Sequence, residues 1–306
     1  MKIGYIGLGK MGKNMVFRLL EQRIDVVAWN RSPQPMVEVG ASGANTSSDI
    51  IHLISQLEAP RIIWLMLPAG DVTDQIIDIL IPLLSPHDLI IDGANSFYKD
   101  TLKRGQLLSQ HSIRFMDIGV SGGPDGARNG ACLMVGGTSE DYQYILPVIK
   151  AASAPQAFGH FGPLGSGHFA KMVHNGIEYG MMQAIAEGAA VLKNSSFDLD
   201  LVEIFRVYGL GSVISSRLVD WTREALEDDI NLVNISAKIN ASGEGEWTVK
   251  TAHELGIEVP IIEKSLDIRT ASQTESSDSP NSFRNKVVSA QRGKFGHHPV
   301  TKSEEV

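Results

Sequence analysis

The sequence has very little cysteine: Cys132 is the only one among 306 residues. A single cysteine cannot close an intrachain disulfide, and no Cys/His cluster has the spacing of a structural zinc site. We therefore expect a reducing compartment, no bound metal, and Cys132 as a small core residue. No apolar run reaches the roughly 18 residues that span a bilayer, and Met1-Lys2 leads into a strand-like segment without a signal-peptide pattern. The sequence predicts a cytosolic protein.

An excess of positive charge is also missing, since the formal net charge is −8. A protein that tracks nucleic-acid phosphates normally carries more Lys and Arg than acids, so broad nucleic-acid binding is not expected. One local exception is the segment 282–303, which has no acidic residue. It is either a solvated basic end or a site for an anionic substrate. Its basic residues are Arg284, Lys286, Arg292, Lys294 and Lys302.

The chain contains enough apolar sequence for two domains, with 43% hydrophobic and 20% charged residues. Its first half alternates strand-like runs with amphipathic stretches, the pattern of βαβ units in a parallel sheet. We place a domain boundary near residue 165. The expected strands are Lys2–Ile6, Asp25–Trp29, Arg61–Leu65, Leu89–Asp92, Arg114–Asp117 and Cys132–Val135.

Residues 166–306 instead show long helical periods and predict an all-α domain. A Ser- and Thr-rich segment, Thr270–Asn281, predicts an exposed loop before a last helix. The other expected helices are His168–Leu192, Asp198–Tyr208 and Ser215–Glu227, and the last one is Ser282–Gln291.

A glycine-rich turn stands near the N-terminus, between a strand-like and a helix-like run. In Gly7-Leu8-Gly9-Lys10-Met11-Gly12 the first glycine permits a tight turn, the second admits a pyrophosphate, and the third allows close helix–strand packing. The helix start supplies backbone N–H groups for an anion. Residues 1–165 are therefore predicted to form a Rossmann-type, doubly wound α/β domain that binds NAD(P), and the alternative is a glycine turn with a structural role alone. The expected contacts are Gly7, Leu8, Gly9, Met11 and Gly12.

The second strand ends at Asn30-Arg31-Ser32, where an NAD enzyme usually has an acid for the ribose hydroxyls. Asn30 carries no charge, and Arg31 offers a planar cation suited to a 2′-phosphate. We favour NADP, with NAD possible, and expect Asn30, Arg31 and Ser32 at the cofactor. The alternative is that Arg31 covers the adenine and tolerates either cofactor.

Four polar residues share one face of the first long helix: Lys171, His174, Asn175 and Glu178 have the spacing i, i+3, i+4, i+7. This helix is apolar nearly all round, which is typical of a buried helix. Because burying unpaired charge is expensive, we expect these groups to line a cavity, with a paired structural network as the alternative.

These residue types suit hydride transfer. A partly desolvated Lys171, with its pKa lowered by burial, could take the proton of a hydroxyl while hydride leaves the same carbon. Asn175 can hold the reacting oxygen, and Glu178 is a second proton donor.

Two further strand ends carry polar residues. Ser121, Gly122 and Gly123 follow the strand that ends at Asp117 and would suit a carboxylate or hydroxyl, although they could equally form a turn. Asn95 follows another parallel strand, at the edge where ligands collect in such sheets.

With these motifs the chain resembles 6-phosphogluconate dehydrogenase in its shorter form, within the β-hydroxyacid dehydrogenase superfamily. Its most specific motif is Lys171-Met172-Val173-His174-Asn175-Gly176-Ile177-Glu178-Tyr179-Gly180. The resemblance is also carried by the glycine turn and by the segments 65–70, 91–96 and 119–123.

The resemblance implies the oxidative decarboxylation of 6-phosphogluconate to ribulose 5-phosphate in the pentose phosphate pathway, without a metal. Lys171 would assist oxidation at C3, and Glu178 would help protonate C1 of the enediol after CO2 leaves. Leu67, Pro68 and Asn95 would contact the cofactor. Substrate contacts are implied for Asn95, Ser121, Gly122, Gly123, His174, Asn175, Tyr179 and Arg269, the last of these at the phosphate.

The resemblance also implies a homodimer or a dimer of dimers. Arg292 and His298 match residues that reach the phosphorylated substrate of the neighbouring subunit. From the residues alone, Arg292 would be a helix-end cation that interacts with the helix dipole.

One position departs from the family pattern: Glu246 stands where a basic residue is common, so a contact to the substrate's anionic groups could be missing. Two other functions stay open, a dehydrogenase of a short β-hydroxy acid such as 3-hydroxyisobutyrate and a non-catalytic NADPH sensor. Six histidines have no expected role beyond surface or packing: His52, His87, His111, His160, His168 and His253.

Overall fold

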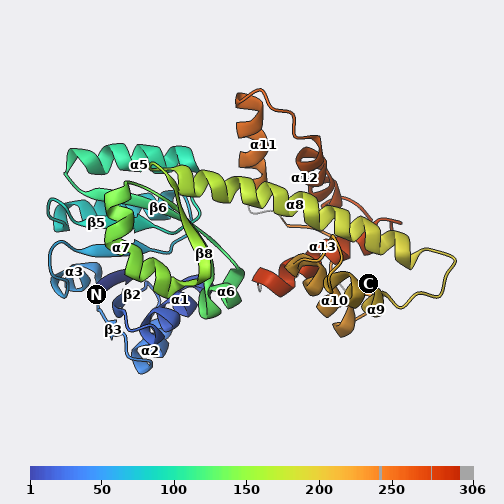
Figure 1. The fold of residues 1–306 in the computed structure, drawn as a ribbon, viewed down its shortest axis with the longest axis horizontal. Helices are drawn as coiled ribbons and strands as arrows, with labels where there is room; N and C mark the ends of the chain where they lie inside the picture. Colours follow the sequence, from blue (N-terminus) through green and yellow to red (C-terminus); the bar gives the residue numbers. More distant parts are fainter. Residues whose placement is uncertain (241–242, 277, 297–306) are drawn as a thin grey trace. The chain divides into compact units, whose positions relative to one another are not determined.

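The chain divides into two compact units, Met1–Met172 and Val173–Val306. The computed structural model describes residues 1–240, 243–276 and 278–296 (Figure 1). Helix α8, Ser166–Lys193, begins in the first unit and ends in the second. The sequence-based boundary near 165 remains a prediction.

The first unit is built on one eight-stranded sheet with the order β3-β2-β1-β4-β5-β6-β7-β8 (Figure 1). The order reverses direction between β1 and β4, so the polypeptide winds outward on both sides of that point. In open α/β sheets, ligands bind at such a switch point, beyond the carboxyl ends of the strands. The strands are β1 Lys2–Ile6, β2 Asp25–Trp29, β3 Asn45–Thr46, β4 Ile62–Leu65, β5 Leu89–Asp92, β6 Arg114–Ser121, β7 Ala131–Gly136 and β8 Ser153–Gly162.

All six expected strands are present, and the doubly wound fold is confirmed. The expectation of a parallel sheet is wrong at one place, because β7 pairs antiparallel with β6. Only the short helix α6, Gly123–Asn129, separates these two strands. A right-handed crossover to a parallel neighbour normally needs a dozen or more residues, whereas a short connection favours an antiparallel return.

The apolar side chains of each central strand alternate between two cores. Ile62 and Trp64 pack on one face of the sheet, and Ile63 and Leu65 pack on the other. Helices cover both faces and bury these strands completely, as parallel sheets require. The helices are α1 Lys10–Glu21, α2 Pro33–Ala41, α3 Ile50–Ser55, α4 Asp71–Leu80, α5 Tyr98–Gln110, α6 and α7 Ser139–Ala152, with the 3₁₀ turn η1 Ile81–Leu83.

The assignment of Cys132 to the core is wrong, because its side chain is exposed. In β7 the neighbours Ala131 and Leu133 are buried. Successive strand residues point to opposite faces, so Cys132 shares the other face with Met134, and it is exposed although Met134 is buried. A lone cysteine in a short apolar run does not indicate which face it occupies.

The second unit is helical, as expected. Its core is formed by apolar side chains from α8, α9, α10 and α13, among them Met182, Phe205 and Val288. The expected loop at Thr270–Asn281 is wrong at its start, because α12 continues to Ser272. The remaining helices are α9 Leu201–Gly209, α10 Arg217–Asp228, α11 Glu244–Glu254, α12 Pro260–Ser272 and α13 Ser282–Gly296.

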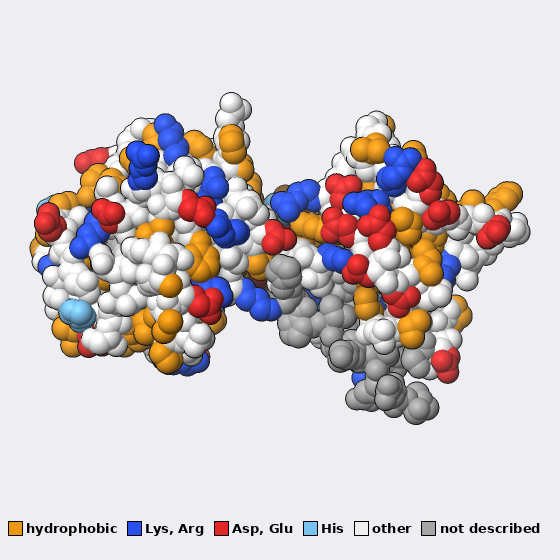
Figure 2. Space-filling view, turned by 90° about the horizontal axis from the view of Figure 1, so that it is seen from below, with side chains coloured by type: hydrophobic (Ala, Val, Ile, Leu, Met, Phe, Trp, Pro, Cys, Tyr) orange, Lys and Arg blue, Asp and Glu red, His pale blue; other side chains and the backbone are white. Residues whose placement is uncertain are grey.

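The surface carries charge of both signs. On the face in Figure 2, Lys and Arg side chains stand among Asp and Glu side chains. Within the described part of the chain, no helix is both long and apolar enough to cross a membrane. A cytosolic location remains a prediction.

Candidate active site

The glycine turn after β1 has the shape that a dinucleotide requires. Gly7 has a φ of +102°, and a Cβ there would lie 2.2 Å from the carbonyl oxygen of Met66. A Cβ on Gly12 would lie 2.0 Å from the carbonyl oxygen of Gly7, so helix α1 packs directly on the turn. A Cβ on Gly9 would meet no atom within 4 Å. Gly7 and Gly12 are thus needed for packing, whereas Gly9 leaves an open approach to the start of α1.

Asn30 has a structural task at this turn. Its Oδ1 accepts a hydrogen bond from the backbone N–H of Leu8 at 2.9 Å, and its Nδ2 donates to the carbonyl oxygen of Ser32 at 3.0 Å. The side chain therefore ties the glycine turn to the end of β2, where a ribose would bind. The next residue, Arg31, is exposed.

Arg104 on α5 joins two loops that follow neighbouring strands. Its Nη1 donates to Asp92 Oδ2 at 3.0 Å and to Ser96 Oγ at 2.8 Å, in the loop after β5. Its Nη2 donates to the carbonyl oxygen of Gly70 at 3.2 Å, in the loop after β4, and its Nε donates to Asp74 Oδ1 at 2.7 Å. Burial lowers the pKa of Arg104, but the hydrogen bond to Asp74 and the charge of Asp92 outweigh burial and raise it.

The predicted cofactor residues Leu67 and Pro68 lie in the first of these loops. The hydroxyl of Thr73 donates to the carbonyl oxygen of Pro68 at 3.0 Å. Leu67 is half-buried and Pro68 is exposed, so both have accessible surface.

Asn95, in the second of these loops, is bound to β6. Its Oδ1 accepts from the backbone N–H of Val120 at 2.8 Å, and its Nδ2 donates to the carbonyl oxygen of Val120 at 3.1 Å. Its backbone has a φ of 52°. These contacts bring Asn95 next to the predicted substrate residues Ser121, Gly122 and Gly123, and they leave one Nδ2 hydrogen and one Oδ1 lone pair for a ligand.

Asp117 of β6 holds the start of α8. Its fully buried carboxylate accepts from the backbone N–H groups of Gly165 and His168, each at 2.7 Å. The first N–H groups of a helix have no partner within the helix and carry partial positive charge, so an acid there satisfies both. Asp117 thereby fixes the helix that carries Lys171.

Lys171 is placed against β6 one helical turn later. It is 6% exposed, and a Cβ on Gly119 would lie 2.4 Å from its Cβ and 3.1 Å from its Cγ. The aliphatic part of the lysine therefore uses the space that Gly119 leaves. The predicted desolvation of Lys171 agrees with this burial.

His174, Asn175 and Glu178 follow on the same face of α8. His174 Nδ1 lies 3.0 Å from Asn175 Oδ1 and 3.7 Å from Glu178 Oε2. Asn175 is buried, while His174 and Glu178 are partly exposed. These three residues form a connected polar group, which is compatible with either the predicted site or the alternative of a structural network.

The expectation that α8 is buried all round is wrong. Ile177 is 53% exposed and Met181 is 42% exposed. Met182, Ala186 and Ala189 enter the core of the second unit, and their spacing of four and three residues covers one side of the helix only. Ile177 and Met181 project from another side.

Two buried arginines lie in the second unit, and one of them stands over Tyr179. Arg269 on α12 is 3% exposed, and its guanidinium carbon lies 3.5 Å from the centroid of the Tyr179 ring. Burial lowers the pKa of Arg269 to about 10, so it is still a cation at neutral pH. Arg292 on α13 is 9% exposed, and burial lowers its pKa as well.

Arg292 and Arg269 therefore occupy the same unit of one chain. That Arg292 also reaches the substrate bound in a neighbouring subunit remains a prediction. The other predicted tail residue, His298, lies outside the described residues.

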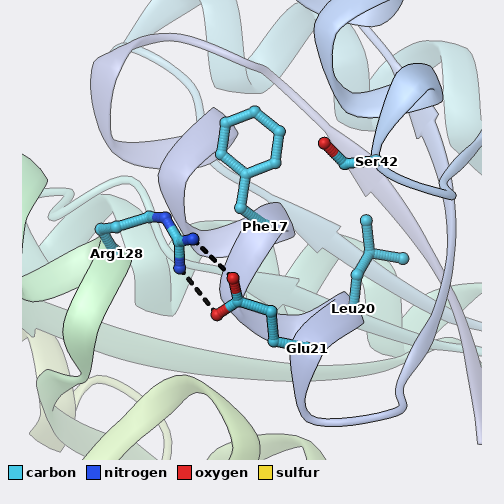
Figure 3. Close-up of a pocket in the computed structure, with 5 residues that line it drawn as sticks. All are labelled: Phe17, Leu20, Glu21, Ser42 and Arg128. Carbon is cyan, nitrogen blue, oxygen red and sulfur yellow. Dashed lines mark hydrogen bonds and ion pairs between the residues drawn. The ribbon is translucent and has the colours of Figure 1, made fainter.

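A separate hollow lies at the far end of α1. It has a volume of about 380 Å³ and is lined by Phe17, Leu20, Glu21, Ser42 and Arg128 (Figure 3). The Arg128 guanidinium forms a two-pronged ion pair with the Glu21 carboxylate, which links the ends of α1 and α6. None of the predicted site residues lines this hollow, and it lies at the opposite end of α1 from the glycine turn, so we do not assign the chemistry to it.

Three residues of this region were not singled out from the sequence: Asp117, Arg104 and Gly119. Asp117 was seen only as a strand end, although an acid at the end of an apolar strand is a recognisable signal. The roles of Arg104 and Gly119 depend on contacts between distant segments, which no local pattern shows. Among the described residues, no group of three or more His, Cys, Asp or Glu is placed to hold a metal ion.

Two family models together match nearly the whole chain. Residues 2–162 match the NAD-binding domain of 6-phosphogluconate dehydrogenase, and residues 167–305 match the C-terminal domain of 6-phosphogluconate dehydrogenase. The chain is also 36% identical, over its whole length and that of the relative, to the NAD⁺-dependent, decarboxylating 6-phosphogluconate dehydrogenase of Haloferax volcanii.

Solved structures show the same fold. Plasmodium falciparum 6-phosphogluconate dehydrogenase, described with NADP⁺ and with 6-phosphogluconate, superposes with a TM-score of 0.80 at 28% identity, over 95% of this chain and 70% of that one. Mycobacterium tuberculosis 3-hydroxyisobutyrate dehydrogenase gives a TM-score of 0.73 at 22% identity, over 95% of this chain and 99% of that one. The second likeness shows the shared fold alone.

Proposed function

Because the chain belongs to the 6-phosphogluconate dehydrogenase family, we propose that it converts 6-phosphogluconate to ribulose 5-phosphate and CO2. Like its family, it is an NAD(P)-dependent oxidoreductase. The substrate, the order of the chemical steps and the residues below are part of the proposal.

The observation that carries the proposal is the pair of buried arginines, Arg269 and Arg292. Burying two cations in one unit costs folding free energy unless an anion balances their charge. Guanidinium groups bind phosphate through paired hydrogen bonds, and they do so best where water is excluded. A short β-hydroxy acid has no second anionic end to place there, so the pair favours a phosphorylated substrate.

The glycine turn fits a nicotinamide dinucleotide. The space beside Gly9 is open, and Gly12 lets α1 start against the turn. Backbone N–H groups at the start of α1 would hold the pyrophosphate, and the residues after β2 would hold the ribose. When bound, the nicotinamide supplies the acceptor for the hydride from C3.

Lys171 acts first as a base. Its amine, neutral when substrate binds, takes the proton of the C3 hydroxyl, and the C3 carbonyl forms. The C1–C2 bond of the resulting β-keto acid then breaks and CO2 leaves. The electron pair moves to the C3 oxygen, which regains a proton from the Lys171 ammonium, so that an enediol forms.

Glu178 completes the reaction as a second acid. It protonates the carbon that has lost CO2, while the C3 hydroxyl returns its proton to the Lys171 amine, and the enediol becomes the ketone of ribulose 5-phosphate. Glu178 lies two turns after Lys171 on the same face of α8, and its carboxylate is near His174. Asn175 and His174 would orient the substrate oxygens, and Ser121 to Gly123 its carboxylate or hydroxyl groups.

We further propose a homodimer. Ile177 and Met181 of α8 are exposed in the single chain. Exposed apolar patches on a protein surface often mark sites of protein–protein interaction. Sedimentation of the purified protein tests this. Ile177→Glu should shift the mass toward the monomer, while a protein that is monomeric at micromolar concentration without any substitution would contradict the proposal.

The function is tested with the purified protein, 6-phosphogluconate, and either NADP⁺ or NAD⁺. We expect reduced nicotinamide, CO2 and ribulose 5-phosphate in equal amounts. Lys171→Met should leave nucleotide binding intact and lower kcat by about 10² or more, the usual contribution of general base catalysis. The control is Ile51→Met, which changes an exposed residue of α3.

Three results would contradict the proposal. Turnover of 3-hydroxyisobutyrate-like acids alone would favour the short-acid dehydrogenase. Nucleotide binding without turnover of either substrate class would favour a sensor. A Lys171→Met variant that keeps more than about a tenth of the rate would require another base, because the expected loss is about 10².

A further inference from the structure

The two buried arginines converge on one acceptor. Arg269 Nη1 donates to the carbonyl oxygen of Asn240 at 3.3 Å, and Arg292 Nη1 donates to the same oxygen. A carbonyl dipole cannot neutralise two guanidinium charges. The remaining charge must be balanced by nearby acids when no ligand is bound.

Two carboxylates act on this pair. Glu178 and Glu244 both favour the charged form of Arg269 and of Arg292, against the larger effect of burial, which lowers the pKa of each arginine. The proposed reaction uses Glu178 as a proton donor. Glu244, in the first turn of α11, has no assigned task.

The position of Glu244 is set by the contact between α11 and Tyr179. A Cβ on the next residue, Gly245, would lie 2.6 Å from ring atoms of Tyr179. The Arg269 guanidinium lies 3.5 Å from the centroid of that ring. The first turn of α11 is thus held against the same aromatic ring as the arginine.

One oxygen of Glu244 is in an unusual state. Its Oε2 is shielded from solvent and accepts no hydrogen bond from the described residues. A buried carboxylate oxygen without a donor costs free energy, because the hydration it loses is not replaced. The charge of the neighbouring arginines offsets part of this cost, and an unsatisfied buried group of this kind calls for a functional or structural explanation.

We propose that Glu244 is the resident counter-ion of the Arg269–Arg292 pair and competes with the phosphate of the substrate. Because the acid already balances part of the positive charge, a ligand has to bring more charge than one carboxylate to replace it. Glu244 is therefore a specificity-determining residue that favours a doubly charged phosphoryl group. This inference rests on the proposed function for its phosphorylated substrate.

The test is the affinity of the full chain for inorganic phosphate, measured by calorimetry without nucleotide or sugar acid. Glu244→Gln removes the charge and keeps the shape. Glu254→Gln, at the far end of the same helix and exposed, removes the same charge and is the matched control. We expect Glu244→Gln to bind phosphate about tenfold more tightly, which corresponds to about 1.4 kcal/mol, and Glu254→Gln to stay within about twofold.

Two outcomes would overturn the inference. Equal changes in both variants, including no binding by either, would mean that only overall charge matters. Weaker binding by Glu244→Gln would mean that Glu244 holds the arginines in place instead of competing with the ligand. If Glu244→Gln fails to fold, Glu244→Asp provides the comparison: it keeps the charge, withdraws it by one methylene, and should bind phosphate more tightly than the unchanged protein.

The inference and the proposed function fail separately. If 6-phosphogluconate is not turned over but Glu244→Gln still tightens phosphate binding, the proposed function is wrong and the counter-ion stands. If the substrate is turned over and the phosphate affinity does not change, only the counter-ion is wrong. The KM for 6-phosphogluconate should fall in Glu244→Gln in parallel with the phosphate Kd.

Discussion

Lys171 lies directly opposite the bare α-carbon of Gly119: a Cβ on Gly119 would stand 2.4 Å from the Cβ of Lys171. It would also stand 2.9 Å from the carbonyl oxygen of Gly167, which belongs to the backbone of α8. Strand β6 thus determines how closely the helix and its lysine approach the sheet.

Gly119→Ala is expected to lower kcat by about 10² while nucleotide binding changes little, because a displacement of about 1 Å can misplace a catalytic group by that factor. The measurement is kcat beside the nucleotide Kd. Gly188→Ala in the same helix is the control, since a Cβ there meets no atom within 4 Å. A normal kcat in Gly119→Ala would show that Lys171 does not depend on this contact.

Asp117→Asn is expected to destabilise the first unit by about 1–3 kcal/mol, because an amide offers a donor where Gly165 or His168 needs an acceptor. Denaturant unfolding measures this. Asp25→Asn, at the exposed start of β2, should change stability by no more than about 0.5 kcal/mol. Equal stability of both variants would contradict the capping role of Asp117.

Arg104→Lys keeps the charge but loses the planar fork that reaches Asp92, Ser96 and Gly70 together. We expect the loops after β4 and β5 to separate, so the nucleotide KM should rise severalfold more than kcat falls. Lys103→Met, an exposed neighbour, is the control. A loss of stability with an unchanged KM would limit Arg104 to a structural role.

Arg31→Ala should weaken NADP binding far more than NAD binding, because only NADP carries the 2′-phosphate that a guanidinium would bind. The relative from Haloferax volcanii is NAD⁺-dependent, and the Plasmodium falciparum structure is described with NADP⁺. Kd values for both nucleotides settle the preference. Equal losses would refute the assignment of Arg31 to the phosphate.

Arg128 should control the titration of Glu21. The hydrogen bonds from Arg128 lower the pKa of the Glu21 carboxyl. The stabilisation from this ion pair is therefore complete above the ordinary carboxyl pKa and is lost as the pH falls through the lowered value. Arg128→Met should move the Glu21 carboxyl titration, followed by NMR, to higher pH.

Arg206→Met removes a similar fork with Glu203 elsewhere and should leave the Glu21 titration unchanged. If the Glu21 carboxyl of the unsubstituted protein titrates with the pKa of an ordinary glutamate, the ion pair in Figure 3 does not persist in solution.

The sequence by itself was sufficient for six of the eight strands of the sheet and for the helix that bears Lys171, but β3 and β8 were not predicted. Short apolar runs and a helical period of about 3.6 residues are local properties, and the runs correctly located β1, β2 and β5 to the residue. The glycine turn could also be predicted, because a tight turn followed at once by a closely packed helix requires small residues at fixed spacing.

Faces and partners could not be read in this way. Three features depend on which element lies next to which: the exposure of Cys132 in β7, the antiparallel return of β7, and the exposure of Ile177. The contacts of Arg104 with two loops likewise join residues that are far apart in the chain.

The arginine pair shows the difference most clearly. Arg269 and Arg292 could each be named from the sequence, but their shared acceptor, Asn240, and the buried oxygen of Glu244 could not. Local sequence determines which charges are available and on which helix each one stands. Only the packing of α8, α11, α12 and α13 decides which charges are desolvated together. Desolvation matters because charges interact more strongly where water is excluded.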